Sequence, residues 1–156
     1  MKSYRTILMA TDFSKPADGA FAHALQLATA CGARLRIVHV VAPYETAYFE
    51  HVGATKRRDV EVKLQSRLEA HVKKLLGRSR VRYTVELAWG EPAETLVSLG
   101  GPCDLLVMGA RGLNEWESLI VGSVAERVVH HARVPVLVVN PKRANGGAVK
   151  STKRAA

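Results

Sequence analysis

The stretch that decides the fold is CDLLVMGARGLNEWESLIVGSVAERVVHHARVPVLVV, residues 103–139. It contains two short apolar runs, 105–108 and 136–139, and neither includes a charged residue. Uninterrupted runs of this length are typical of strands in a parallel sheet that helices cover on both faces. Between the runs, Gly122-Ser123 precedes a segment whose apolar residues recur at helical spacing: Val124, Val128 and Val129. The stretch therefore predicts strand, loop, helix and strand, as in an α/β fold.

The glycines of this stretch have a spacing that suits the phosphates of a nucleotide. Two residues separate Gly109 from Gly112, and nine more separate Gly112 from Gly122-Ser123. Glycine lets a backbone turn sharply and come close to a ligand. The free N–H groups of a helix's first turn bind anions, so we predict an anion site where the helix begins. The pattern is neither a G-x4-G-K-[ST] loop nor a dinucleotide fingerprint, because its third glycine comes too late.

The rest of the chain alternates strand and helix patterns, which predicts a single α/β domain. We expect strands at 6–10, 35–41 and 81–88, and helices after Ser14, from about Lys56, and over 91–99. Gly32 and Gly77 are expected to end the first two helices. Wound in both directions from the first strand, the five parallel strands form an open, Rossmann-like sheet in the order 3-2-1-4-5, with helices on both faces. Its ligand crevice is expected between strands one and four, beside the turns at 11–12 and 109–111.

Taken together, these motifs resemble the universal stress protein family, in the subgroup with the ATP-binding pattern G-x2-G-x9-G-[ST]. The resemblance runs from Tyr4 to about Val139 and rests on four segments in the family's order. They are ILMATDFS at 7–14, VHVVAP at 38–43, GEPAETLV at 90–97 and GSVAERVVHHARVPVLVV at 122–139. The resemblance implies an adenine nucleotide alpha hydrolase-like fold and a pocket for ATP, with Mg²⁺ on the phosphates.

The resemblance also implies which residues contact the nucleotide. The Asp12 carboxylate lies in the pocket, the backbone of Val40 pairs with the adenine edge, and the glycines border the ribose and phosphates. The full implied set is Ala10, Thr11, Asp12, Val40, Met108, Gly109, Arg111, Gly112, Gly122, Ser123 and Val124.

Several of these residues have an alternative structural interpretation. Asp12 is also suited to a turn, Ser123 to an ordinary helix start and Met108 to the core, while Arg111 either neutralises a phosphate or lies in solvent. Two acidic residues of the nine-residue spacer, Glu115 and Glu117, either point to solvent or help to hold a metal ion on the nucleotide. His39 is expected to be a packed strand residue.

Composition limits the classes of protein to consider. The chain has 156 residues and a formal net charge of +9, but residues 141–156 hold five basic residues and no acidic one. We therefore expect a nucleotide-binding domain over 1–140 with a charge of +4, and a basic, disordered tail that has no specific nucleic-acid target. No apolar run approaches the length of a membrane span or a signal-peptide core, so a cytoplasmic location is expected. Cys31 and Cys103 are expected to be reduced.

The sequence predicts an ATP-binding protein that acts in stress response or signalling, with at most slow turnover. It contains no nucleophilic triad and no zinc-ligand pattern, so we predict no catalytic residue. A slow ATPase or phosphotransferase, a nucleotide-free scaffold, and a protein that associates with nucleic acid through its tail remain alternatives. A homodimer through strand five is expected, because 135–139 is an uncharged edge that no later element covers.

Overall fold

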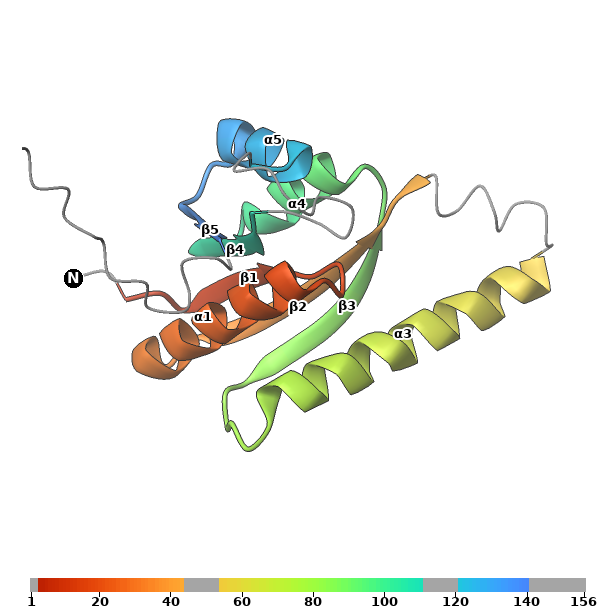
Figure 1. The fold of residues 1–156 in the computed structure, drawn as a ribbon, viewed down its shortest axis with the longest axis horizontal. Coiled ribbons are helices and arrows are strands. Elements are labelled where there is room, and N and C mark those ends of the chain that lie inside the picture. Colours follow the sequence, from red (N-terminus) through yellow and green to blue (C-terminus); the bar gives the residue numbers. More distant parts are fainter. Residues whose placement is uncertain (1–2, 44–53, 111–120, 141–156) are drawn as a thin grey trace, which may run out of the picture.

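Five parallel strands and four helices alternate along the described part of the chain (Figure 1). The computed structural model describes residues 3–43, 54–110 and 121–140. In order, the elements are β1 (Thr6–Ala10), α1 (Lys15–Cys31), β2 (Arg34–Val41), α3 (Ala54–Leu76), β3 (Tyr83–Trp89), α4 (Pro92–Gly100), β4 (Leu105–Gly109), α5 (Ser123–His131) and β5 (Val136–Val139). The sheet has the order β3-β2-β1-β4-β5, with every neighbouring pair parallel, which confirms the predicted topology.

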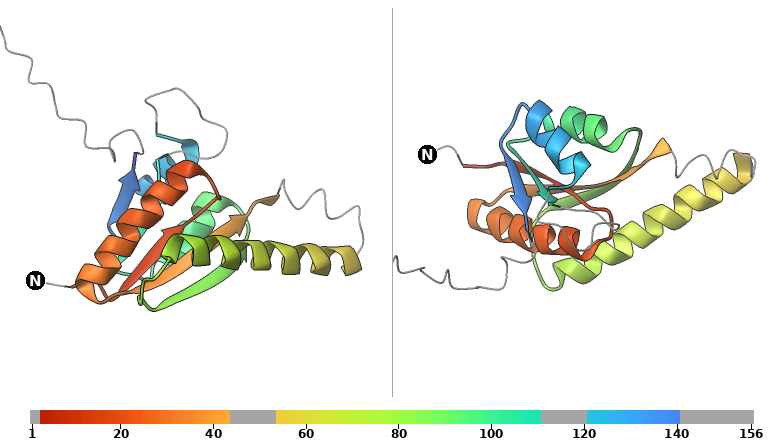
Figure 2. Two further views of the ribbon diagram at one scale, coloured as in Figure 1. Left: turned by 60° about the horizontal axis from the view of Figure 1, so that its bottom comes forward. Right: turned by 45° about the horizontal axis from the view of Figure 1, so that its top comes forward.

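Helices cover both faces of the sheet, as predicted (Figure 2). Side chains of successive strand residues point to opposite faces, so each strand supplies both layers. In β1, Ile7 and Met9 pack in one core cluster with residues of α1 and α3. Leu8 lies in the other cluster, with residues of α4 and α5. The central strands are therefore buried on both sides, which explains their uninterrupted apolar sequences.

Local capping signals set the ends of α1. The Ser14 side chain accepts a hydrogen bond from the backbone N–H of Ala17 at 3.2 Å, and Pro16 lies in the first turn. Gly32 ends the helix in the left-handed conformation, at φ 66°, where a side chain would be strained. Both ends of α1 were predicted from these residues.

Two details differ from the sequence prediction. β3 begins at Tyr83 rather than Val81, because the register with β2 starts at the pair of Leu35 with Tyr83. In α5 the buried residues are Ala125 and Val128, whereas Val129 is 51% exposed. Ala125 and Val128 lie three apart and so share a helix face, while Val129 is rotated by about 100° from Val128 and leaves that face.

Neither cysteine forms a disulfide: Cys103 is buried and Cys31 half-buried. Burial raises the pKa of the Cys103 thiol, whose sulfur lies 3.6 Å from the Arg36 guanidinium. Arg36 also donates to a Glu86 oxygen at 2.7 Å, which links β2 to β3. Among the helices of the described ranges, none is both long and apolar enough to cross a membrane.

Candidate functional site

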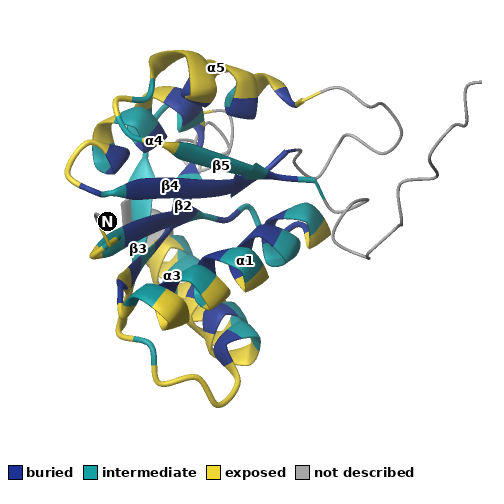
Figure 3. Ribbon diagram, turned by 90° about the vertical axis from the view of Figure 1, so that its left-hand side faces the viewer, coloured by how far each residue is buried: buried dark blue, intermediate teal, exposed yellow. Residues whose placement is uncertain are grey.

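The predicted site residues lie at the carboxyl edge of the sheet, where the winding reverses between β1 and β4. Figure 3 shows the arrowheads of β4 and β5 pointing to the side on which α1 and α5 begin. The two strands pair directly, up to Met9 with Val107, so that Ala10 and Met108 come next on adjacent strands and Gly109 follows one residue later. Ligands of doubly wound sheets bind at this kind of reversal.

The turn after β1 is held by its own polar groups. Thr11 donates its N–H to the Val38 carbonyl at 2.9 Å and accepts from the N–H of Phe13 on its hydroxyl at 3.2 Å. Asp12 is half-buried, and its Oδ1 accepts from the N–H of Ser14 at 3.0 Å. Asp12 therefore has the turn role that its position suggested. A carboxylate has about four acceptor sites, so this bond leaves capacity for a ligand.

Val40 lies in β2, two residues beyond the last residue of β2 that pairs with β1. In β2, the Val38 carbonyl bonds to the segment after β1, whereas the Val41 carbonyl accepts from Gly90 after β3. Because alternate residues of a strand direct their backbone groups to opposite sides, the N–H and C=O of Val40 face the β1 side. There β1 has already ended, since Ala10 pairs with Val38. Within the described ranges, the backbone groups of Val40 on this side have no hydrogen-bond partner.

The glycine that ends β4 serves helix packing. A Cβ added to Gly109 would lie 3.0 Å from the carbonyl carbon of Pro16 and 3.1 Å from the nitrogen of Ala17. Gly109 thus lets the first turn of α1 approach the strand, which is a packing reason for glycine here; the expected approach of a ligand stays a prediction. The Met108 side chain is buried in the core cluster with α4 and α5, and Met108 pairs with Val138 of β5. Leu106 and Ala110 donate to carbonyls of the β5 segment, so by alternation the backbone of Met108 also faces β5.

The start of α5 is attached to the end of β4. The buried Gly122 donates its N–H to the Ala110 carbonyl at 2.8 Å, and its own carbonyl accepts from Glu126 at 2.9 Å. As the N-cap residue, Gly122 has no side chain to accept from the first turn. The N–H groups of Ser123 and Val124 consequently lack an intrahelical acceptor. Arg111, Gly112, Glu115 and Glu117 lie outside the described residues.

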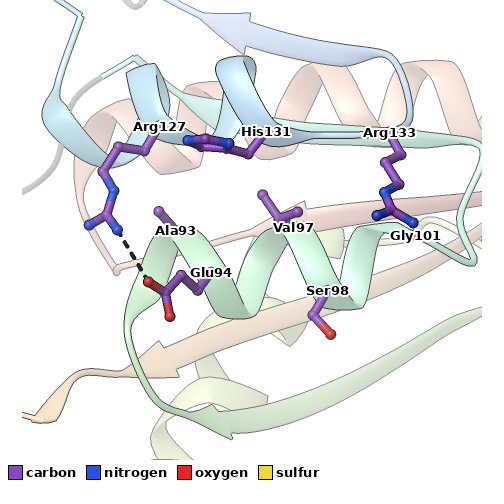
Figure 4. Close-up of a pocket in the computed structure, with 8 residues that line it drawn as sticks. All are labelled: Ala93, Glu94, Val97, Ser98, Gly101, Arg127, His131 and Arg133. Carbon is purple, nitrogen blue, oxygen red and sulfur yellow. Dashed lines mark hydrogen bonds and ion pairs between the residues drawn. The ribbon is translucent and has the colours of Figure 1, made fainter.

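A groove of about 450 Å³ lies elsewhere, between α4 and α5 (Figure 4). It is lined by Ala93, Glu94, Val97, Ser98, Gly101, Arg127, His131 and Arg133, none of which was a predicted site residue. Across it, Arg127 binds Glu91 at 2.8 Å and Glu94 at 3.4 Å. Sequence reasoning missed this link, because residues 33 and 36 positions apart give no local signal. No group of three or more potential metal ligands occurs in the described part of the chain.

The sheet order, the polar turn after β1 and the uncapped α5 define a doubly wound α/β protein with its open edge at the reversal. The model of the universal stress protein family matches residues 3–140, and the chain belongs to this family. A universal stress protein of Thermus aquaticus is 38% identical over 142 residues, which cover 87% of this chain and 98% of that protein.

Two solved structures show the same fold. The structure of hypothetical protein MJ0577 superimposes with a TM-score of 0.77 at 26% identity, covering 89% of this chain and 97% of that one. A universal stress protein solved in complex with cAMP has a TM-score of 0.65 at 25% identity, covering 89% of this chain and 98% of its own.

Proposed function

We propose that this protein binds an adenine nucleotide at the carboxyl edge of β1 and β4, and that it acts in stress response or signalling. The observation that carries the proposal is a set of backbone groups around this edge, at Val40 and at the start of α5, for which the described residues supply no hydrogen-bond partner. These residues are half-buried or exposed, so their backbone groups are accessible to a polar ligand from outside the chain. A related protein was solved with cAMP, which supports an adenine compound.

Each part of the nucleotide has a matching group. The adjacent N–H and C=O of Val40 suit adenine, whose edge offers a ring-nitrogen acceptor beside an amino donor. Asp12 suits the ribose hydroxyls, and the N–H groups of Ser123 and Val124 suit phosphate oxygens. ATP is the expected ligand, and Mg²⁺ would come with its phosphates. Hydrolysis of ATP is expected to be slow, because these groups bind the nucleotide but do not activate a water molecule. The Asp12 carboxylate already accepts a hydrogen bond from the N–H of Ser14.

The direct test is mass spectrometry of the small molecules that denaturation releases from freshly purified protein. We expect an adenine nucleotide in near-stoichiometric amount, and calorimetry should then rank ATP, AMP and cAMP. A protein that carries none and binds none of the three would overturn the proposal and favour the scaffold alternative.

Asp12→Ala is expected to weaken ATP binding by about tenfold or more, because a hydrogen bond to a charged group contributes about 1.5–3 kcal/mol. The free energy of unfolding should fall by only about 1 kcal/mol, the usual contribution of one turn hydrogen bond. Calorimetry and thermal unfolding measure the two effects separately. Asp12→Asn is the matched control, as it keeps the acceptor for Ser14 and removes the charge. Full affinity in Asp12→Ala together with a large loss of stability would leave only the turn role.

A homodimer is proposed through β5, which is an edge strand of the sheet. The carbonyls of Pro135 and Val139 accept bonds from β4, so by alternation the backbone of Val138 faces away from the sheet. Antiparallel pairing of two β5 edges would satisfy these groups.

Val138→Pro removes an N–H that faces away from the sheet and leaves the hydrogen bonds between β4 and β5 in place. We therefore expect light scattering to show a monomer. Val129→Lys, on the exposed side of α5, is the control. Retention of the dimer in Val138→Pro would place the interface elsewhere.

A further inference from the structure

Phe13, next to Asp12, has an unusual backbone conformation. Its φ is 65°, and across the described ranges it is the one non-glycine residue with a positive φ. A bulky side chain rarely adopts this region, because its Cβ crowds the backbone. Such a conformation persists only where the surrounding structure holds it. The contacts of the Phe13 ring show what holds it.

Three side chains from two elements surround the Phe13 ring. On β2, the His39 ring lies with its centroid 4.7 Å away, tilted by 55°. On α3, the His71 ring meets it edge-on at 5.4 Å, and the Arg67 guanidinium carbon lies 4.5 Å from the ring centroid. A guanidinium over an aromatic face is attracted by the ring's electrons. The ring is therefore held chiefly by α3, which is distant in sequence.

The same histidines contact the segments on either side of Phe13, one at a backbone carbonyl and the other at a side chain. The buried His39 donates from Nδ1 to the Thr11 carbonyl at 2.8 Å, since a carbonyl can only accept. His71 Nε2 lies 2.7 Å from a carboxylate oxygen of Asp18 in the first turn of α1. The residues before and after the 12–13 turn are thus tied to β2 and α3.

We propose that Phe13 is a positioning residue of the nucleotide site, and that α3 sets the direction of Asp12 through the Phe13 ring. The inference rests on the proposed function, because it assigns a role to residues that would not touch the nucleotide. Asp12 lies between the Thr11 carbonyl, held by His39, and Phe13, held by Arg67 and His71. The contacts of Arg67 and His71 with the Phe13 ring are consequently coupled to binding of the nucleotide: whatever separates them from the ring weakens binding.

The test is the affinity of Phe13→Ala for ATP, measured by calorimetry. At this positive φ alanine is strained as phenylalanine is, because it also has a Cβ. It loses every ring contact that holds the conformation, so we expect the turn to relax to other conformations. If one molecule in about ten retains the binding conformation, the apparent Kd rises about tenfold. Phe13→Tyr keeps the ring and should restore the wild-type affinity. Amide hydrogen exchange at Ser14, whose N–H bonds to Asp12, should be faster in Phe13→Ala and unchanged in Phe13→Tyr.

Leu76→Ala is the matched control for a general loss of stability that leaves Arg67, His71 and the Phe13 ring unchanged. Leu76 is buried at the end of α3, five residues beyond His71, and its truncation should lower stability without changing affinity per folded molecule. Wild-type affinity in Phe13→Ala would overturn this inference alone. A wild-type protein that binds neither ATP nor cAMP would overturn the proposed function and this inference with it.

Discussion

Gly122→Val is expected to reduce ATP affinity by about a hundredfold or more, because it removes the space beside at least two phosphate-binding N–H groups, each contributing about 1.5–3 kcal/mol. Gly122 is buried and precedes the uncapped first turn of α5. Its backbone is extended, at φ −65° and ψ 154°, a region open to any residue, so valine does not strain the backbone there. The start of the helix should therefore keep its backbone conformation.

Calorimetry with ATP measures this effect, and circular dichroism checks that the fold is retained. The neighbouring Val121 is 43% exposed, so Val121→Ala changes the volume of a side chain at the same place without entering the proposed cradle. We expect wild-type affinity in this control. Equal affinities for wild type and Gly122→Val would mean that the phosphates, if bound, lie away from α5.

Gly109→Ala should destabilise the fold by about 1–3 kcal/mol, the usual cost of forcing extra volume into a packed core. The added Cβ would meet the backbone of Pro16 and Ala17 at 3.0–3.2 Å, and backbone moves less easily than the end of a side chain. For a domain of this size, each kcal/mol lowers the melting temperature by about 2–4 °C. Thermal unfolding checks the prediction.

Gly19→Ala is the matched control. Gly19 lies in α1, the helix against which Gly109 packs, and a Cβ added to Gly19 would have nothing within 4 Å. Alanine in a helix interior is more favourable than glycine by about 0.5–1 kcal/mol, so this change should raise the melting temperature. The two glycine-to-alanine changes are expected to have opposite signs. A Gly109→Ala protein as stable as wild type would show that α1 can shift away from β4.

Gly109 and Gly122 belong to the same spacing motif, but in the structure they have different surroundings. The first is required by the approach of α1, whereas the second precedes an uncapped helix start. Spacing alone describes both as glycine corners near a ligand. It could not distinguish them, because what a missing Cβ makes room for depends on which segment lies opposite, and α1 is about ninety residues away in sequence.

The elements and their order were determined by the sequence itself. Apolar runs without charge predicted the strands that are buried on both faces, and Ser14 and Gly32 predicted both ends of α1. These signals are local: a cap or a periodicity depends on residues a few positions apart, so it can be recognised without the fold. The connection rules of parallel sheets then converted the order of elements into the strand order.

The tertiary structure alone decided which residues meet across the chain. The backbone groups of Val40 that face β1 have no partner among the described residues, because β1 ends at Ala10, which is a matter of register between two strands. Phe13 is held in a left-handed conformation by Arg67 and His71 of α3, more than fifty residues away. Such contacts depend on how distant elements pack and leave no periodicity or spacing in the sequence. The strands and caps are therefore properties of local sequence, whereas the shape of the candidate site is a property of packing.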